Sequence, residues 1–273
     1  MIRKFSLTIS ILLVIVLLVG CSQDDGLLDD MPAEQLYTMA MAKMEDRNYE
    51  KAAKVFDEVD RQHPYSKWAT KAQLMMGYCY YQVQKYDRAV AAFETFIQLH
   101  PGHADVDYAL YMRGVCYYEQ IFNVRRDQKM AVYAYEALVE VVKRFPNSRY
   151  GKDARYKIDL VRDHMAGKEM SIGRYYLKRD AYLSAINRFR TVVERYETTA
   201  QAPEALHRLV ESYLSLGLTD EAQAAAAVLG NNYPGSHWYA DSYYLLKGVD
   251  LRPEESKVGA SWMNRLLGKR LEG

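Results

Sequence analysis

A short motif recurs along the chain and closes, in most copies, at a proline. The closing pairs are His63–Pro64, His100–Pro101, Phe145–Pro146, Tyr196–Glu197 and Tyr233–Pro234, at intervals of 37, 45, 51 and 37 residues. Twelve residues before the end of each pair stands an alanine: Ala52, Ala89, Ala134, Ala185 and Ala222. Eight residues before it stand Phe56, Phe93, Leu138, Phe189 and Ala226. A small residue followed one turn later by a large one lets two helices pack closely, and proline ends a helix. The repeat therefore predicts five helical units.

The first helix of each unit has its own marker. Gly77, Gly114 and Gly173 occupy matched places, with Tyr80, Tyr117 and Tyr176 three residues later. The last unit has Val210 and Tyr213 there, and the first unit has the poorer match Ala40 and Lys43. The combined pattern resembles the tetratricopeptide repeat. It implies an all-α superhelix of five helix–turn–helix units, whose first helices line a concave groove.

The two long intervals predict where the repeat is interrupted. Eight extra residues fall near 121–128, which we interpret as a loop extension inside the third unit. Fourteen extra residues lie between Pro146 and Gly173, close to four helical turns, so they keep the same face of a helix. We therefore expect one long central helix from about Ser148 to Lys178, with Gly167 and Gly173 as the places where it could break.

The chain begins with features of a secretory signal. Positive charges at Arg3 and Lys4 precede an apolar run from Ile9 to Val19, which is too short to span a membrane comfortably. The following Leu18-Val19-Gly20-Cys21 resembles a bacterial lipobox. The resemblance implies cleavage before Cys21 and acylation of Cys21, and several acyl chains anchor a protein stably to a membrane. Ser22 after the cysteine favours the outer membrane. The alternative is an uncleaved anchor with an incidental cysteine.

These features predict the organisation of the chain. It comprises a lipoprotein signal peptide (1–20), a flexible tether (21–32), N-terminal repeats 1–3 (33–147), C-terminal repeats 4–5 with the long joining helix and a capping helix (148–250), and a C-terminal tail (251–273). In the tail, Trp262 and Leu266 could form a short amphipathic turn that stays disordered or docks on a partner.

Composition and motifs disfavour several classes of function. After loss of residues 1–20 the net charge is about −1, which gives no support for a nucleic-acid partner. The sequence contains no H-E-x-x-H, G-x-S-x-G, P-loop or C-x-x-C pattern, so we expect no enzyme, metal or cofactor. His63 and His100 are interpreted as capping or surface residues. Cys79 and Cys116 occupy equivalent places in adjacent units, about 8–10 Å apart for neighbouring helices, so we expect both to be reduced.

Tyrosine is unusually frequent, with 24 residues against 7 phenylalanines, and it suits interfaces as well as cores. In the repeat frame several tyrosines face the groove together with basic residues, which would suit an extended peptide with aromatic side chains and a free carboxylate. The candidate groove residues are Tyr37, Lys71, Tyr78, Tyr81, Tyr108, Tyr111 and Arg113. The alternative is that these tyrosines only pack neighbouring helices, and for Tyr80 and Tyr117 that alternative is the better one.

The lipobox, the five repeats, "VDYALYMRGVCYYEQ" at 106–120 and "INRFRTVVERY" at 186–196 together resemble the BamD, or ComL, family from Cys21 to about Leu246. The family implies a lipid-anchored scaffold at the periplasmic face of the outer membrane, within the β-barrel assembly machinery. Its implied partners are a BamA-like barrel protein, other lipoproteins of the machinery and the C-terminal targeting segment of unfolded outer-membrane proteins. Asn187 and Arg188 match a family motif that is implied to contact BamA. The alternative for Arg188 is a local ion pair at the surface.

This chain departs from the enteric members of that family by its shorter loop at 121–128 and its longer tail, which puts contact with a BamC-like partner in doubt. A second function remains open: a periplasmic repeat adaptor for envelope division or cell-wall enzymes. Such adaptors resemble the chain in repeats but usually lack a lipobox.

Overall fold

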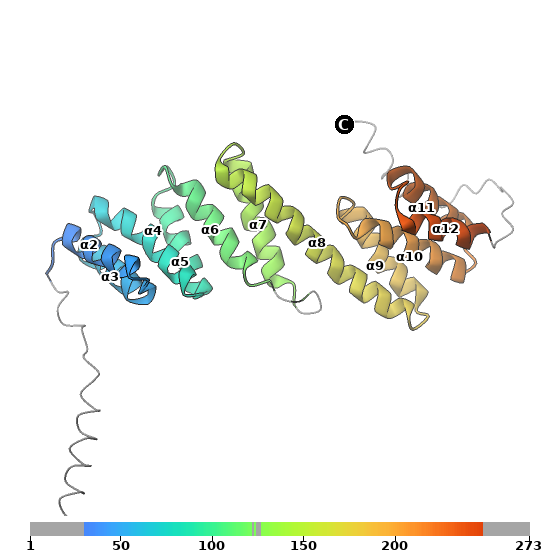
Figure 1. The fold of residues 1–273 in the computed structure, drawn as a ribbon, viewed down its shortest axis with the longest axis horizontal. Helices are drawn as coiled ribbons and strands as arrows, with labels where there is room; N and C mark the ends of the chain where they lie inside the picture. The colour runs from blue at the N-terminus through green and yellow to red at the C-terminus, as the bar shows by residue number, and fades with distance from the viewer. Residues whose placement is uncertain (1–29, 122, 124–126, 248–273) are drawn as a thin grey trace, which may run out of the picture. The chain divides into compact units, whose positions relative to one another are not determined.

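The computed structural model describes residues 30–121, 123 and 127–247, and they form helices joined by short connections. By compactness the chain divides into two units, one ending at His100 and the other beginning at Pro101. The first unit contains α2 (Ala33–Glu45), α3 (Tyr49–Gln62), α4 (Lys67–Gln82) and α5 (Tyr86–Leu99) (Figure 1). Each helix packs on the next in sequence, and α2 also touches α4.

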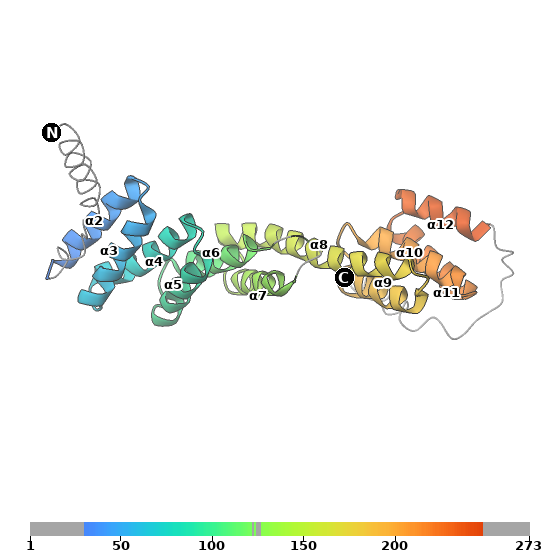
Figure 2. The same ribbon diagram turned by 90° about the horizontal axis from the view of Figure 1, so that it is seen from below.

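The second unit contains α6 (Val106–Tyr118), α7 (Lys129–Arg144), α8 (Arg149–Leu177), α9 (Tyr182–Arg195), α10 (Ala202–Ser215), α11 (Thr219–Asn232) and α12 (His237–Lys247). Consecutive helices again pack together, α6 contacts α8, and α12 covers both α10 and α11 (Figure 2). No strand occurs among the residues described, and the all-α tetratricopeptide fold is confirmed.

The turns between paired helices reuse one backbone conformation. Arg47, Gln84, Asp180 and Gly217 each have φ between 56° and 74° and follow the first helix of a pair. This left-handed conformation lets the chain reverse in a few residues, and only the last copy uses glycine for it. The pair α6–α7 is joined instead by the segment 119–128, where the loop extension was expected.

The small and large residues of the repeat form the core. All five repeat alanines, Phe56, Phe93, Leu138 and Phe189 are fully buried. A Cβ added to Gly77 would lie 2.7 Å from Phe93 Cε1, and one added to Gly173 would lie 2.4 Å from Phe189 Cε1. Gly77 and Gly173 therefore make room for the rings of their own second helices, and Gly114 does the same for Leu138. In the last repeat the sizes are exchanged, with Val210 and Ala226 in one cluster.

The long central helix is confirmed. Helix α8 runs without a break through 29 residues, within one residue of the predicted ends, and Gly167 and Gly173 are buried inside it. Its N-cap is Ser148, whose hydroxyl accepts a hydrogen bond from the Gly151 N–H at 3.0 Å. Figure 1 shows α8 packed beside α7 along one part of its length and beside α9 along the other.

The division after His100 does not coincide with the boundary that we expected between residues 147 and 148. The physical reason is that α8 packs on α6 and α7 as well as on α9, so the third repeat is compact with the two that follow it. The functional halves proposed from the sequence stay a prediction. The signal, Cys21 and the tail lie outside the described residues.

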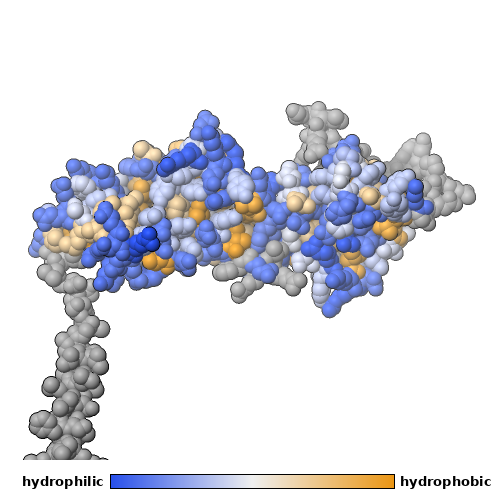
Figure 3. All heavy atoms as spheres, viewed as in Figure 1, coloured by the Kyte–Doolittle hydropathy of each residue, from blue (hydrophilic) through white to orange (hydrophobic). Residues whose placement is uncertain are grey.

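The face that Figure 3 shows is largely polar. On the face that Figure 3 shows, hydrophilic residues cover most of the described surface and hydrophobic residues form separate patches. Exposed aromatic side chains include Tyr65, Tyr156, Tyr175 and Tyr244. Among the described helices none is both long and apolar enough to cross a membrane.

Candidate functional site

In the first unit, the predicted groove residues Tyr37 and Lys71 meet at a tryptophan that the sequence analysis did not select. The ring of Tyr37 lies between Phe56 and Trp68, with centroids 5.5 and 4.9 Å away. The ammonium groups of Lys67 and Lys71 lie 5.2 and 5.4 Å from the Trp68 ring centroid. Burial raises the pKa of Tyr37, so its hydroxyl stays protonated. We call Tyr37, Lys67, Trp68 and Lys71 the Trp68 surface.

The other two candidates of this unit lie further along α4 and contact second helices. Tyr78 meets Tyr49 of α3 edge to face, with centroids 6.3 Å apart. Tyr81 meets Tyr86 of α5 at 6.0 Å. Both candidates are half-buried, so each combines helix packing with a partly accessible ring.

In the second unit, Tyr108 and Tyr111 of α6 meet Tyr150 of α8. The centroid distances are 5.3 and 5.2 Å, and the Tyr111 and Tyr150 rings are stacked. The Tyr111 hydroxyl donates a short hydrogen bond to Asp153 Oδ2, which lowers the pKa of the Asp153 carboxyl. Lys157 pairs with the same carboxylate at 3.2 Å. These contacts therefore join the first helices of two successive repeats, α6 and α8.

Arg113 forms an ion pair with Glu140 of α7, the second helix of its repeat. Its Nη2 lies 2.6 Å from Glu140 Oε2 of α7, and Arg144 binds the other carboxylate oxygen at 2.9 Å. Burial opposes ionisation of Glu140, but hydrogen bonds from both arginines outweigh it, and the pKa of Glu140 is lowered. A peptide carboxylate that used Arg113 would have to compete with Glu140.

The seven predicted groove residues thus form separate clusters. Tyr37, Lys71, Tyr78 and Tyr81 precede the division after His100, and Tyr108, Tyr111 and Arg113 follow it. A single groove that contains both sets stays a prediction.

The predicted partner-binding residues lie on α9. Arg188 Nη1 is 3.1 Å from Glu169 Oε2 of α8, and 43% of its side chain remains exposed. Asn187 is exposed, and its backbone oxygen accepts a hydrogen bond from the Thr191 hydroxyl at 3.0 Å. The local ion pair considered from the sequence therefore exists, and enough of Arg188 is accessible for a second contact.

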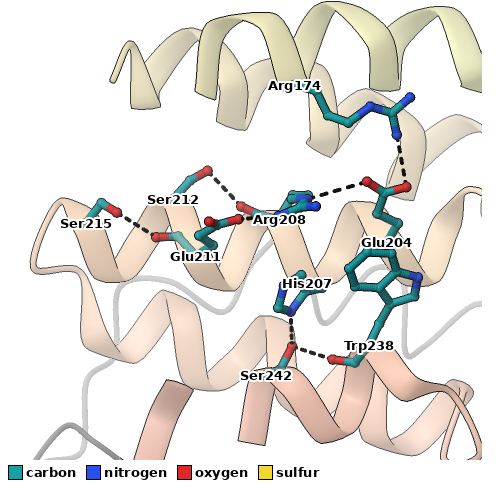
Figure 4. A network of polar contacts seen from close by, with 9 residues as sticks. All are labelled: Arg174, Glu204, His207, Arg208, Glu211, Ser212, Ser215, Trp238 and Ser242. Carbon is teal, nitrogen blue, oxygen red and sulfur yellow. Dashed lines mark hydrogen bonds and ion pairs between the residues drawn. The ribbon is translucent and has the colours of Figure 1, made fainter. Parts of the chain in front are cut away.

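Sequence reasoning missed a polar network that joins three helices of the second unit (Figure 4). Glu204 of α10 binds Arg174 of α8 at 2.9 Å and Arg208 of its own helix at 3.4 Å. His207 Nδ1 lies 2.9 Å from Ser242 Oγ of α12, whose hydroxyl donates to the Trp238 carbonyl. The spacing of Glu204 and Arg208 could have revealed their contact. No local pattern relates His207 to Ser242, which is 35 residues away.

Both interior cysteines are free and buried, as expected for reduced thiols. Burial raises the pKa of each to about 12, so neither thiol ionises near neutral pH. His63 and His100 are C-cap residues of α3 and α5, in agreement with the interpretation from the sequence.

Comparison with known proteins shows the family to which the chain belongs. Residues 29–229 match the YfiO family, described as an outer membrane lipoprotein. An outer membrane protein assembly factor BamD from Caulobacter vibrioides is 44% identical over 275 residues, which cover 98% of this chain and 90% of the relative. BamD from Rickettsia prowazekii is 42% identical, with 89% of this chain and 98% of the relative covered. BamD from Neisseria meningitidis is 36% identical, with 78% and 84% covered. The chain therefore belongs to the YfiO, or BamD, family of outer-membrane lipoproteins.

Proposed function

We propose that the protein is a lipid-anchored scaffold of the outer-membrane β-barrel assembly machinery. The observation that carries the proposal is the 44% identity, over 98% of this chain, to an outer membrane protein assembly factor. The apolar run from Ile9 to Val19, followed by Gly20 and Cys21, supports anchoring by acyl chains at the periplasmic face of the outer membrane.

The scaffold acts by binding and forms or breaks no bonds. Its first helices present tyrosine rings beside ammonium groups, a surface that suits an extended peptide rich in aromatic residues. The peptide in this proposal is the C-terminal targeting segment of an unfolded outer-membrane protein. The C-terminal repeats, with Asn187 and Arg188 exposed on α9, bind a BamA-like barrel protein. Other lipoproteins of the machinery complete the assembly.

The test is a pull-down of the tagged full chain from membranes in mild detergent, with mass spectrometry of the bound proteins. An unrelated lipoprotein with the same tag is the control. We expect the tagged chain to recover a BamA-like barrel protein and unfolded porins. The control lipoprotein should recover neither. Recovery of cell-wall enzymes or division proteins without any barrel-forming subunit would favour the repeat adaptor instead.

A further inference from the structure

Among the described residues, the last helix of the array leaves an apolar face without cover. Helix α12 packs on α10 and α11 (Figure 2), and Ser242 and Leu246 are its buried residues. On its outer side Tyr243, Tyr244 and Leu245 have exposed fractions of 48%, 71% and 42%. A terminal unit of a repeat array usually has a polar outer face, because no further unit stacks on it. The outer face of α12 departs from this rule.

The equivalent positions are covered in earlier repeats. Counted from the closing pair before each helix, Tyr244 of α12 occupies the place of Tyr111 in α6 and of His207 in α10. His207 is only 6% exposed, because α12 lies against it and places Ser242 Oγ 2.9 Å from its ring nitrogen (Figure 4). Tyr111 is stacked on Tyr150 of α8, the first helix that follows α6. The face around Tyr244 is therefore the side on which a following helix would stack.

The chain beyond α12 contains a segment of suitable length and pattern to cover this face. Residues 248–273 continue the chain and lie outside the described range. In 262–271 the apolar side chains recur at helical spacing, so on a helix they would occupy one half of its circumference: Trp262, Met263, Leu266, Leu267 and Leu271. The 13 residues from 248 to 260 can span about 43 Å, whereas the 11 residues of α12 extend over about 16 Å. The segment can therefore turn back and lie along α12.

One charge in the segment matches one charge on α12. Arg270 stands four residues after Leu266 and three after Leu267, so on a helix it falls inside the apolar half. A cation that is covered together with apolar side chains needs an acidic partner. Asp241 is the single acidic residue of α12, is exposed, and lies three residues before Tyr244 on the same side of the helix. It is placed to be that partner.

We propose that residues 262–271 form an amphipathic helix that covers the outer face of α12 in the same chain, with Arg270 paired to Asp241. The tail then supplies the polar cap that α12 lacks. It removes Tyr244 and Leu245 from water, and it keeps two copies of the chain from stacking end to end through this face. The inference is independent of the proposed function, because it requires neither a membrane nor another protein.

The test is a disulfide trap in the purified full chain in detergent. Tyr244→Cys is combined either with Leu266→Cys, on the apolar half of the segment, or with Arg265→Cys, on the other half. A disulfide needs Cα atoms closer than about 7 Å, so Y244C/L266C should link within one chain in high yield and Y244C/R265C in low yield. Cys79 and Cys116 are buried and do not compete. Mass spectrometry of proteolytic fragments identifies the linked pair.

The matched control is L183C/L266C, which should not link, because Leu183 is exposed on α9 and α9 packs on α8 and α10. Added to Y244C/L266C, D241R should lower the yield about threefold and D241R/R270D should restore it. An unchanged yield with D241R would overturn the Arg270–Asp241 pair.

Three results would overturn the docking of the tail. Equal yields from the Leu266 and Arg265 variants would mean that the tail reaches α12 without binding to it. A disulfide between two chains would assign the outer face of α12 to a second copy. No disulfide in either variant would leave the tail away from α12. Because the purified chain is tested alone, none of these results bears on the proposed function.

Discussion

At the scale of single residues, the glycine on the first helix of the second, third and fourth repeats decides how closely the second helix can approach. The Cβ of an alanine at position 77 would lie 2.7 to 2.9 Å from three atoms of the Phe93 ring. A fully buried ring cannot withdraw without displacing its neighbours. In the last repeat the larger first-helix residue Val210 is matched by the smaller Ala226, whereas in the first repeat Ala40 shares a core cluster with Phe56.

We therefore predict that Gly77→Ala lowers the free energy of unfolding by about 1–3 kcal/mol, the usual cost of overpacking a core. Urea unfolding followed by circular dichroism measures it. Gly102→Ala is the control, because a Cβ there would meet no atom within 4 Å, and it should change stability by less than about 0.5 kcal/mol. Equal stability of the two variants would contradict the steric account.

At the scale of helices, α12 is hydrogen-bonded to α10 through His207, which is buried in its neutral form. Burial lowers the pKa of His207, and the adjacent Arg208 lowers it further, while Glu211, Asp241 and Glu204 oppose the shift. A lowered folded-state pKa means that the unfolded chain binds the proton more readily. The stabilisation is thus complete above the unfolded-state pKa, about 6.5, and is lost as the pH falls through the folded-state value.

We predict that the second unit becomes less stable on acidification below about pH 6.5. Thermal unfolding monitored by the fluorescence of Trp238, whose ring is tilted against that of His207 with centroids 5.0 Å apart, measures it. His207→Gln keeps a polar partner for Ser242 but cannot titrate, so its stability should vary less between neutral and mildly acidic pH. An unchanged pH profile in that variant would assign the effect to other groups.

The pattern of the repeat was sufficient to predict the helices but not the side-chain contacts between them. The helix α8 follows from an insertion that preserves the helical period, and the Ala and Phe positions follow from spacing alone. The role of Trp68 was missed because it depends on Tyr37, 31 positions earlier, and on two flanking lysines that look like ordinary surface residues. Arg113 was assigned to the groove, and only the packing of α6 on α7 brings Glu140 to it.

At the scale of the whole molecule, the function that we propose requires that the repeats be held at a membrane. The anchor that we propose is an acylated Cys21, which lies outside the described residues. We predict that Cys21→Ala moves the protein from the membrane pellet to the soluble fraction or leaves it as an uncleaved precursor, because the acyl chains supply the anchoring free energy. Fractionation followed by mass spectrometry of the N-terminus distinguishes these results from a mature, membrane-bound variant, which would contradict lipidation.

The last prediction separates partner binding from local stability at Arg188. The ion pair with Glu169, in which 43% of the Arg188 side chain and 20% of the Glu169 side chain are exposed, contributes about 0–1 kcal/mol. Because Arg188→Glu also places two carboxylates together, we expect it to lower the free energy of unfolding modestly, by about 1 kcal/mol. If Arg188 also contacts the barrel-forming partner, the same variant should lose co-purification of that partner. The charge-swapped variant R188E/E169R rebuilds the local pair with the charges exchanged, and we expect it to recover any lost stability without recovering the partner. Recovery of the partner by the swapped variant would show that Arg188 acts only by holding α9 against α8.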